Sequence, residues 1–379
     1  MKMKVWICFW TYAPLHQGHL DVIMRAKKEN DKCLVFVCGE DNDRGCSCWL
    51  PLRKRYRLVK KFFEDDGLVT VICNNETSLW LDNSWSDENW EVWLFDIYNQ
   101  LQENGIFWDI TRYVSERFYK ESLEVAMKKL WEINWIVNNP VVLMDRSENL
   151  VSWTECRKNP LENWSKIAQT FRGNFSHNIL VLWTASEWKT TLVQDIAKYF
   201  WLVYSEEYWR LAMEKNLKSD WDLTCKDFVD YLNGQYLLNR LKIDSEANTW
   251  VFISDTDNLV TLMYAKRYTT MKDVDSDPNN IFPLTKLEYE TVLKPLAKTL
   301  HKWTKWDKIF FLTPNNDFVD DGVRYMLQAS MEERKINEKI LCELLEEFDL
   351  MDKVEFLKWW TYYENFCKVK DYIKKLFNF

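Results

Sequence analysis

Short apolar runs separated by amphipathic stretches open the chain. Residues 4–9 and 33–38 are apolar runs typical of buried strands, and residues 20–28 between them have the spacing of an amphipathic helix. The alternation continues with helix 52–63, strand 69–73, helix 89–102, strand 111–114 and helix 121–130. This order predicts a parallel sheet with helices on both faces, so we expect an α/β domain of Rossmann-like type.

A second alternation starts at residue 179, with a strand, a loop and a helix. The later segments are a helix-rich stretch at 204–241, strands at 251–254 and 308–313, and a helical C-terminal third. Residues 169–178, QTFRGNFSHN, are the expected linker. We therefore expect two α/β domains, at 1–172 and 173–379.

Composition narrows the class of function. The 379 residues are 47% hydrophobic and 28% charged, and the net charge of -8 argues against a nucleic-acid or anionic-membrane surface. No apolar run approaches the roughly 18 residues of a membrane span. Ten cysteines without a C-x-x-C pair, and only four histidines, do not favour zinc and fit reduced cytoplasmic thiols. Small-molecule chemistry in the cytoplasm is the expectation.

The first motif is WTYAPLHQGHL at 10–20. His16 and His19 stand at the entry to a helix, directly after the first strand, and Gly18 between them allows close backbone approach to a phosphate. Histidines so placed can donate hydrogen bonds to a reacting triphosphate and stabilise its charge. The alternative is a pair of histidines that only cap the helix.

The second motif is LVLWTASEWKTT at 180–191. Lys189, Thr190 and Thr191 open a helix as the end of the phosphate-binding loop G-x-x-x-x-G-K-[ST] does. Trp183 and Trp188 occupy the two glycine positions, where an indole would fill the phosphate site or force an unfavourable φ. The residues between the two tryptophans are Thr184, Ala185, Ser186 and Glu187.

Further matches give the chain a family resemblance. The first motif resembles the H-x-G-H nucleotidyltransferases, with Thr11 in register and Trp10 in place of the leading glycine. VSWTECR at 151–157 resembles their I-S-[GA]-T-x-x-R, with Trp153 at a small-residue position. Followed by N-P and a phosphate loop, this order resembles the bifunctional nicotinamide-nucleotide adenylyltransferase and ribosylnicotinamide kinase family of the NadR type. We expect the helix-turn-helix segment of some members to be lacking here.

The resemblance implies roles in the first domain. His16 and His19 would contact the triphosphate of ATP, and Arg55 would either add charge or lie on a solvated basic helix face. The other implied phosphate-binding residues are Trp10, Thr11, Gly18, Ser152, Trp153, Thr154 and Arg157.

It implies roles in the second domain, a P-loop kinase domain, as well. Lys189 would reach the β- and γ-phosphates, Thr190 and Asp255 would ligate Mg²⁺, and Asp255 is also a candidate base. Arg324, in FVDDGVR, would close a lid over the transferring phosphoryl group. The riboside would be bound by Glu207, Tyr208 and Arg210, from SEEYWR.

The implied reactions are phosphorylation of ribosylnicotinamide by ATP and adenylylation of nicotinamide mononucleotide to NAD with release of pyrophosphate. Mg²⁺ is expected at both sites, and a homo-oligomer is compatible with the resemblance. The alternatives are an adenylyltransferase with a degenerate kinase half, a pseudoenzyme, and an aromatic-rich binding module.

Tryptophan and glycine are out of proportion. The chain has 22 Trp and 8 Gly, whereas about 7% of residues, or roughly 26, are expected to be glycine. Tryptophan stands at small-residue positions of the family motifs, at residues 10, 153, 183, 188, 209 and 250, and at natural positions at 90, 93, 164 and 306. A source that reads UGA as glycine, translated as if UGA meant tryptophan, predicts this pattern. Genuine tryptophans would instead block both sites.

Overall fold

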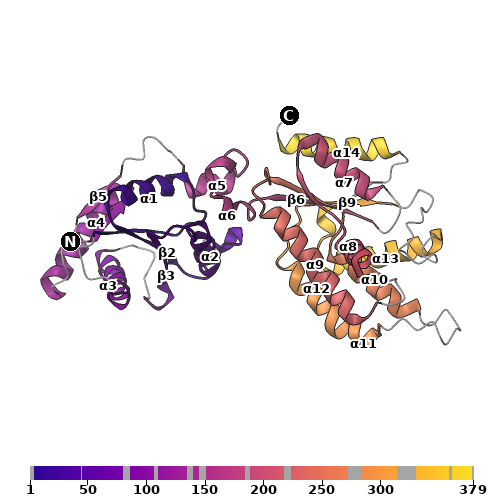
Figure 1. Cartoon of the computed structure of the whole chain (residues 1–379), viewed down its shortest axis with the longest axis horizontal. Helices are drawn as coiled ribbons and strands as arrows, with labels where there is room; N and C mark the ends of the chain where they lie inside the picture. The colour runs from indigo at the N-terminus through magenta and orange to yellow at the C-terminus, as the bar shows by residue number, and fades with distance from the viewer. Residues whose placement is uncertain are drawn as a thin grey trace. The chain divides into compact units, whose positions relative to one another are not determined.

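The structure, a computed structural model, falls into two compact units, Met1–Phe175 and Ser176–Phe379 (Figure 1). The described residues are 4–43, 45–79, 86–105, 110–134, 140–144, 151–183, 188–216, 223–271, 284–313, 330–357 and 361–377. Each unit is built on a five-stranded parallel sheet. The division lies inside the expected linker, although part of that stretch forms the helix Gln169–Arg172.

The first unit has strand order β3-β2-β1-β4-β5. Its strands are β1 (Val5–Trp10), β2 (Lys32–Gly39), β3 (Val69–Asn75), β4 (Ile110–Val114) and β5 (Val141–Leu143). Its helices are α1 (Gln17–Glu29), α2 (Leu52–Phe62), α3 (Asp87–Glu103), α4 (Arg117–Asn134), α5 (Trp153–Lys158) and α6 (Gln169–Arg172). Short 3-10 turns are Cys46–Cys48, Glu76–Leu79 and Trp164–Lys166.

Strand β1 shows how the sequence makes this layered core. Trp6 and Cys8 pack into the cluster formed with α1 and α2, whereas Val5 and Ile7 pack into the cluster formed with α3 and α4. Successive side chains of a strand point to opposite faces, so a continuous apolar run is buried on both sides. Figure 1 shows α1 and α3 on opposite sides of this sheet.

The second unit has strand order β10-β9-β6-β8-β7. Its strands are β6 (His177–Leu182), β7 (Val203–Ser205), β8 (Val251–Ser254), β9 (Lys308–Leu312) and β10 (Val354–Leu357). Its helices are α7 (Lys189–Phe200), α8 (Tyr208–Asn216), α9 (Cys225–Ile243), α10 (Asn258–Met271), α11 (Lys286–Glu288), α12 (Lys294–His301), α13 (Met331–Glu347) and α14 (Tyr362–Leu376). A π-helical turn at Tyr289–Leu293 and a 3-10 turn at Met351–Lys353 complete the unit.

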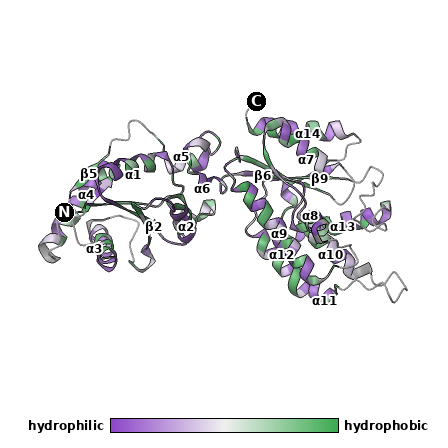
Figure 2. Ribbon diagram, in the orientation of Figure 1, coloured by the Kyte–Doolittle hydropathy of each residue, from purple (hydrophilic) through white to green (hydrophobic). Residues whose placement is uncertain are grey.

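In both sheets the first strand of the unit lies in the interior and later strands pair on either side of it. Ligands of open parallel sheets bind beyond the carboxyl ends of strands, where the strand order reverses. The two motifs follow the carboxyl ends of β1 and β6, so the fold places both of them at such an edge. Figure 2 shows hydrophobic residues concentrated on central strands such as β2 and β6. Among the described helices, none is both long and apolar enough to cross a membrane.

The structure departs from the expected elements at short strands. Residues 203–205, where a helix-rich stretch was expected to begin, form β7, and neither β5 nor β10 was predicted. These strands have three or four residues, which is too short for a periodicity to show.

Candidate active sites

A cavity of about 700 Å³ lies beyond the carboxyl ends of β1 and β2 in the first unit. It brings together residues from motifs separated by more than a hundred positions. Those of its lining residues that the sequence singled out are Trp10, Thr11, His16, His19, Ser152 and Trp153. The size suits a nucleotide-like ligand, since small-molecule sites usually enclose about 300 to 1,000 Å³.

His16 and His19 form a stacked pair at the start of α1. Their ring centroids are 3.8 Å apart with an interplanar angle of 24°, and the side chains are 1% and 3% exposed. The His16 backbone N–H donates to His19 Nδ1 at 3.4 Å. In neutral His19 the proton therefore resides on Nε2, which is the nitrogen left to donate to a ligand.

Gly18 has little room for a side chain. A Cβ atom there would lie 3.2 Å from His16 Cε1 and 3.4 Å from the Val151 carbonyl oxygen. The Trp10 ring packs against His19 at 5.1 Å between centroids and against Tyr12 at 5.8 Å. The indole thus covers part of the cavity wall beside the histidines.

Helix α5 presents the second motif to the same turn. Ser152 is its N-cap and accepts a hydrogen bond from the Glu155 N–H at 3.2 Å. Arg157 Nη1 donates to the Ala13 carbonyl at 3.2 Å, and its guanidinium lies 3.5 Å from the centroid of the Trp153 ring. Arg157 therefore ties α5 to the histidine turn, and Thr154 lies partly exposed in the first turn of the helix.

Acidic residues that sequence reasoning missed also line the cavity. They are Glu40, Asp43, Glu76 and Glu116. Burial raises the pKa of Glu76 to about 7, although Trp93 Nε1 donates to its Oε1 at 2.7 Å. These carboxylates follow three strands, β2, β3 and β4, so no single local spacing in the sequence predicts that they lie together.

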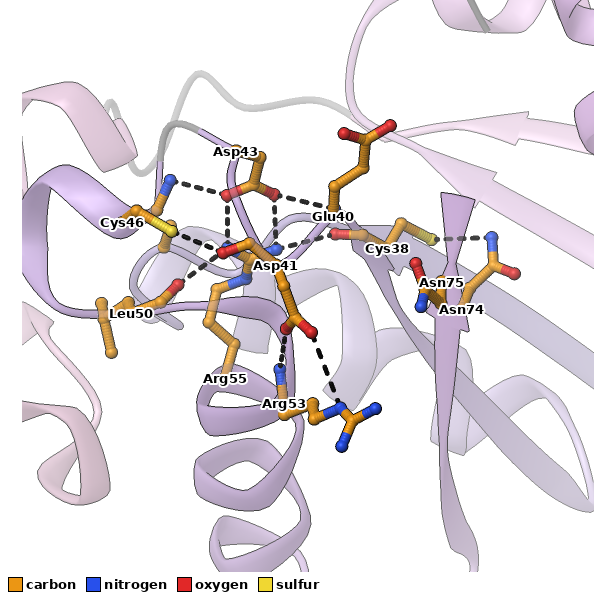
Figure 3. Close-up of polar contacts among 12 residues, drawn as sticks. Cys38, Glu40, Asp41, Asp43, Cys46, Leu50, Arg53, Arg55, Asn74 and Asn75 are labelled. Carbon is orange, nitrogen blue, oxygen red and sulfur yellow. Dashed lines mark hydrogen bonds and ion pairs between the residues drawn. The ribbon is translucent and has the colours of Figure 1, made fainter. Parts of the chain in front are cut away.

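Arg55 does not lie on a solvated helix face, because its side chain is buried. Its guanidinium is fully buried and makes two hydrogen bonds to the carboxylate of Asp43, at 2.7 and 2.6 Å (Figure 3). It also donates to the carbonyls of Leu50 and Cys38. The loop after β2 is thus folded around Arg55, so the expectation of a solvated basic helix face is wrong, whereas a contribution of its charge to the site stays a prediction.

In the second unit Lys189 begins α7 and is 6% exposed. Its Nζ lies 2.7 Å from Glu207 Oε1 and 3.9 Å from Asp255 Oδ2, and it donates to the Asp255 carbonyl. Arg210 Nη2 lies 3.4 Å from the other oxygen of Glu207. Four residues named from three separate sequence motifs therefore meet at the carboxyl edge of this sheet.

Asp255 is a buried carboxylate of this cluster with a raised pKa. Burial, opposed by Lys189 and reinforced by the charge of Glu207, raises its pKa to about 6. Thr190 Oγ1 donates to Asp255 Oδ2 at 2.7 Å. The other oxygen, Oδ1, is buried and has no hydrogen-bond partner among the residues that the structure describes. Such an atom suits a cation or a ligand hydrogen, because buried polar atoms are otherwise almost always satisfied.

The other predicted site residues differ in burial. Thr191 is exposed on α7, and Tyr208 is half-buried at the start of α8. Trp183 is fully buried and its ring lies 5.4 Å from that of Phe311, so its side chain belongs to the hydrophobic core. Thr184, Ala185, Ser186, Glu187 and Arg324 lie outside the described residues.

The backbone at several tryptophans is of the kind that glycine prefers. Six described non-glycine residues have positive φ, and four of them are Trp49, Trp188, Trp201 and Trp250. Trp188 has φ 58° as the N-cap of α7, and Trp201 has φ 55° after its last turn. A left-handed residue after a helix is usually glycine, because a Cβ atom is strained there.

The indole N–H groups of four tryptophans differ in their hydrogen-bond partners. Trp93 Nε1 donates to Glu76, and Trp306 Nε1 donates to Asp257 Oδ2 at 2.7 Å. In contrast, the buried Nε1 atoms of Trp183 and Trp250 have no partner among the described residues. The indole N–H groups of Trp93 and Trp306 are hydrogen-bonded, whereas burying those of Trp183 and Trp250 without a partner costs free energy.

Each half of the chain matches a known protein family. Residues 8–157 match the cytidylyltransferase-like family and residues 178–351 match the AAA domain family. The chain is 25% identical over 373 residues to the trifunctional NAD biosynthesis/regulator protein NadR of Escherichia coli (strain K12), covering 94% of this chain and 79% of that protein.

Solved structures agree over both units. A NadR protein in complex with NR has a TM-score of 0.78 and 31% identity, covering 94% of this chain and 89% of that one. A NadR protein in complex with NAD and AMP-PNP has a TM-score of 0.79 and 30% identity, covering 99% and 97%. The similarity therefore extends through the histidine turn, the Lys189 cluster and both sheets.

Proposed function

The chain belongs to the NadR family of NAD-biosynthesis enzymes, and on this premise we propose that its two units catalyse consecutive steps. The second unit transfers the γ-phosphoryl group of ATP to ribosylnicotinamide, giving the mononucleotide and ADP. The first unit transfers the adenylyl group of another ATP to the phosphate of nicotinamide mononucleotide, giving NAD and pyrophosphate. ATP-dependent small-molecule chemistry of this kind belongs in the cytoplasm, where we propose that the protein acts.

The stacked histidine pair is the observation that carries the adenylyltransferase proposal. His16 and His19 are held beside the cavity by α1, and His19 Nε2 is the donor for a phosphate oxygen of ATP. Hydrogen bonds to the triphosphate stabilise the charge that develops as the mononucleotide phosphate attacks and pyrophosphate leaves. Ser152, Thr154 and Arg157 supply further donors from α5.

The buried Lys189–Glu207–Asp255 cluster carries the kinase proposal. Lys189 would bind the β- and γ-phosphates once ATP is present, which releases Glu207 to accept a hydroxyl of the riboside. Asp255 lies on the same side of the lysine and is the candidate for taking the hydroxyl proton. Tyr208 and Arg210 flank the riboside, and Arg324 is proposed to close over it.

The described residues of the kinase site include two oxygen groups that suit Mg²⁺. The hydroxyl of Thr190 and the carboxylate of Asp255, with its unsatisfied Oδ1, would hold the ion. Oxygen ligands together with phosphates are the usual environment of Mg²⁺, which neutralises phosphate charge. Three or more His, Cys, Asp or Glu side chains do not gather into a metal cluster anywhere in the described chain.

Whether the kinase site can bind ATP depends on the identity of residues 183 and 188. We propose that glycine occupies these positions in the natural protein, together with 10, 153, 201, 209 and 250. The positive φ of Trp188, Trp201 and Trp250 and the unsatisfied indole of Trp183 support this reading. UGG codons at 183, 188 and 201 in the source gene would contradict it, and the intact mass of protein from the source cell is an independent check.

Separate assays of the two reactions test the function. The protein should phosphorylate ribosylnicotinamide with ATP and, independently, form NAD from nicotinamide mononucleotide and ATP. Adenylyl transfer without phosphorylation would favour a degenerate kinase half, and neither activity would favour a pseudoenzyme. Ligand binding without turnover would favour the aromatic-rich binding module.

A further inference from the structure

Gln235 bridges the two peptide groups that flank Glu207. It lies in the middle of α9 and is 1% exposed. Its Oε1 accepts a hydrogen bond from the Tyr208 N–H at 2.8 Å, and its Nε2 donates to the Glu206 carbonyl at 3.1 Å. One side-chain amide thus satisfies the backbone immediately before and after the glutamate that pairs with Lys189.

This contact matters because Glu207 has no regular secondary structure to fix it. Residues 206 and 207 connect β7 to α8 and belong to neither element. Peptide groups beside a buried residue such as Glu207 need hydrogen-bond partners, and here a side chain from a distant helix provides two of them. The orientation of the Glu207 carboxylate therefore depends on Gln235.

Gln235 is itself held in place from two strands. Its Nε2 also donates to Asn239 Oδ1 at 3.0 Å, one turn further along α9. The same Asn239 oxygen accepts hydrogen bonds from Ser205 and Ser254, the last residues of β7 and β8. Ser254 directly precedes Asp255, so one buried network connects the backbone on which both carboxylates of the kinase site are carried.

Gly234, next to Gln235, is a second and independent observation that α9 accommodates the segment 206–208. A Cβ atom at Gly234 would lie 2.0 Å from Cε1 of the Tyr208 ring. Glycine inside a helix costs about 0.5 to 1 kcal/mol relative to alanine, so its presence requires a compensating contact. The ring of Tyr208 lies against the helix backbone and supplies that contact.

We propose that Gln235 is a positioning residue for the kinase reaction: it holds Glu207 toward Lys189, and Gly234 seats Tyr208 beside it. This inference rests on the proposed kinase function, because Glu207 and Tyr208 are the residues assigned to the riboside. It predicts that changes at Gln235 alter the use of ribosylnicotinamide more than the use of ATP.

The test compares Gln235→Leu with Asn233→Leu. Both variants are made in protein whose codons are translated as the source cell translates them. Asn233 is on the same helix, and among the described residues its amide donates along α9, to the Val229 carbonyl at 3.0 Å. For Gln235→Leu we expect the KM for ribosylnicotinamide to rise about tenfold or more, the worth of one lost hydrogen bond of about 1.4 kcal/mol. The KM for ATP and the adenylyltransferase rate of the first unit should stay within about twofold.

Gln235→Glu keeps the proposal testable if the leucine variant does not fold. Glutamate retains an acceptor for the Tyr208 N–H but has no donor for the Glu206 carbonyl, so we expect a KM for ribosylnicotinamide between those of the wild type and Gln235→Leu. A second variant, Gly234→Ala, should raise the same KM by displacing Tyr208. An unchanged riboside KM in a folded Gln235 variant would overturn the inference. A wild-type chain that neither binds nor phosphorylates ribosylnicotinamide would overturn the proposed function, and with it the role of Gln235.

Discussion

Lys189 and Glu207 form a buried ion pair, with Nζ 2.7 Å from Oε1 and side-chain exposures of 7% and 4%. Burying two charges is costly, and it is tolerated when each charge has a close partner. The pair therefore fixes the position of the Lys189 ammonium beside Glu207 at the start of α7.

Lys189→Met should strongly slow the phosphorylation of ribosylnicotinamide while NAD formation continues. Removing one group that stabilises transition-state charge lowers the rate by about 10²- to 10³-fold. Lys198→Met is the matched control on the same helix, because Lys198 is 74% exposed and pairs only with Asp195 at 3.7 Å. Parallel assays of the two reactions on each variant provide the measurement, and equal losses in both variants would count against the proposed role.

His19→Ala should have the opposite selectivity. We expect the adenylyltransferase rate to fall by about 10²- to 10³-fold, because a donor to the reacting phosphate is lost, with the kinase rate unchanged. Gln17→Ala is the control, since Gln17 is exposed between the two histidines. Should His19→Ala form NAD at the wild-type rate, the histidines would only cap the helix.

The ionisation of Asp255 predicts a pH dependence with a definite sign. Burial raises its pKa in the folded protein to about 6, above the value of about 4 in an unfolded chain. Between these values the folded state binds more protons, so this group lowers the free energy of unfolding as the pH rises from about 4 to about 6. Asp255→Asn should lack that fall, which is at most about 1.4 kcal/mol per pH unit.

Urea unfolding of both proteins across this pH range measures the difference. The kinase rate of the wild type should rise over the same window, because a metal ligand or base must be ionised. A difference in stability that does not vary with pH would show that Asp255 is not the titrating group.

Trp201→Gly should stabilise the chain as written. Trp201 has φ 55° and is 87% exposed, so glycine relieves backbone strain of about 1 to 2 kcal/mol and sacrifices little buried apolar surface. Trp303→Gly is the matched control, since Trp303 is also exposed and does not have positive φ. Denaturant midpoints should rise for the first variant only.

Arg55→Ala should destabilise the first unit by about 3 kcal/mol or more, because the change leaves the Asp43 carboxylate and two carbonyls without their donor. Arg53→Ala should cost less than about 1 kcal/mol, since Arg53 is 78% exposed and its pair with Asp41 is 3.6 Å long. Equal stability of the two variants would contradict the role given to Arg55.

The sequence was informative where a signal was local and long. Both central strands, the helices after them and the spacing of His16 and His19 followed from consecutive residues. Arg55 could not be placed, because its burial depends on Asp43, which lies 12 positions earlier in the loop before the helix. Glu76 and Gln235 were missed for the same reason: their importance arises only when separate strands and helices meet.

The hydrogen bonds of Trp93 and Trp306 limit how the gene can be rewritten for expression elsewhere. A synthetic gene that replaced every tryptophan by glycine would leave Glu76 and Asp257 without their indole donors. A gene that kept every UGA codon would terminate early in a host that reads UGA as stop. Whether to encode tryptophan or glycine must therefore be decided position by position, from the backbone φ angle and the hydrogen-bond partner of the indole.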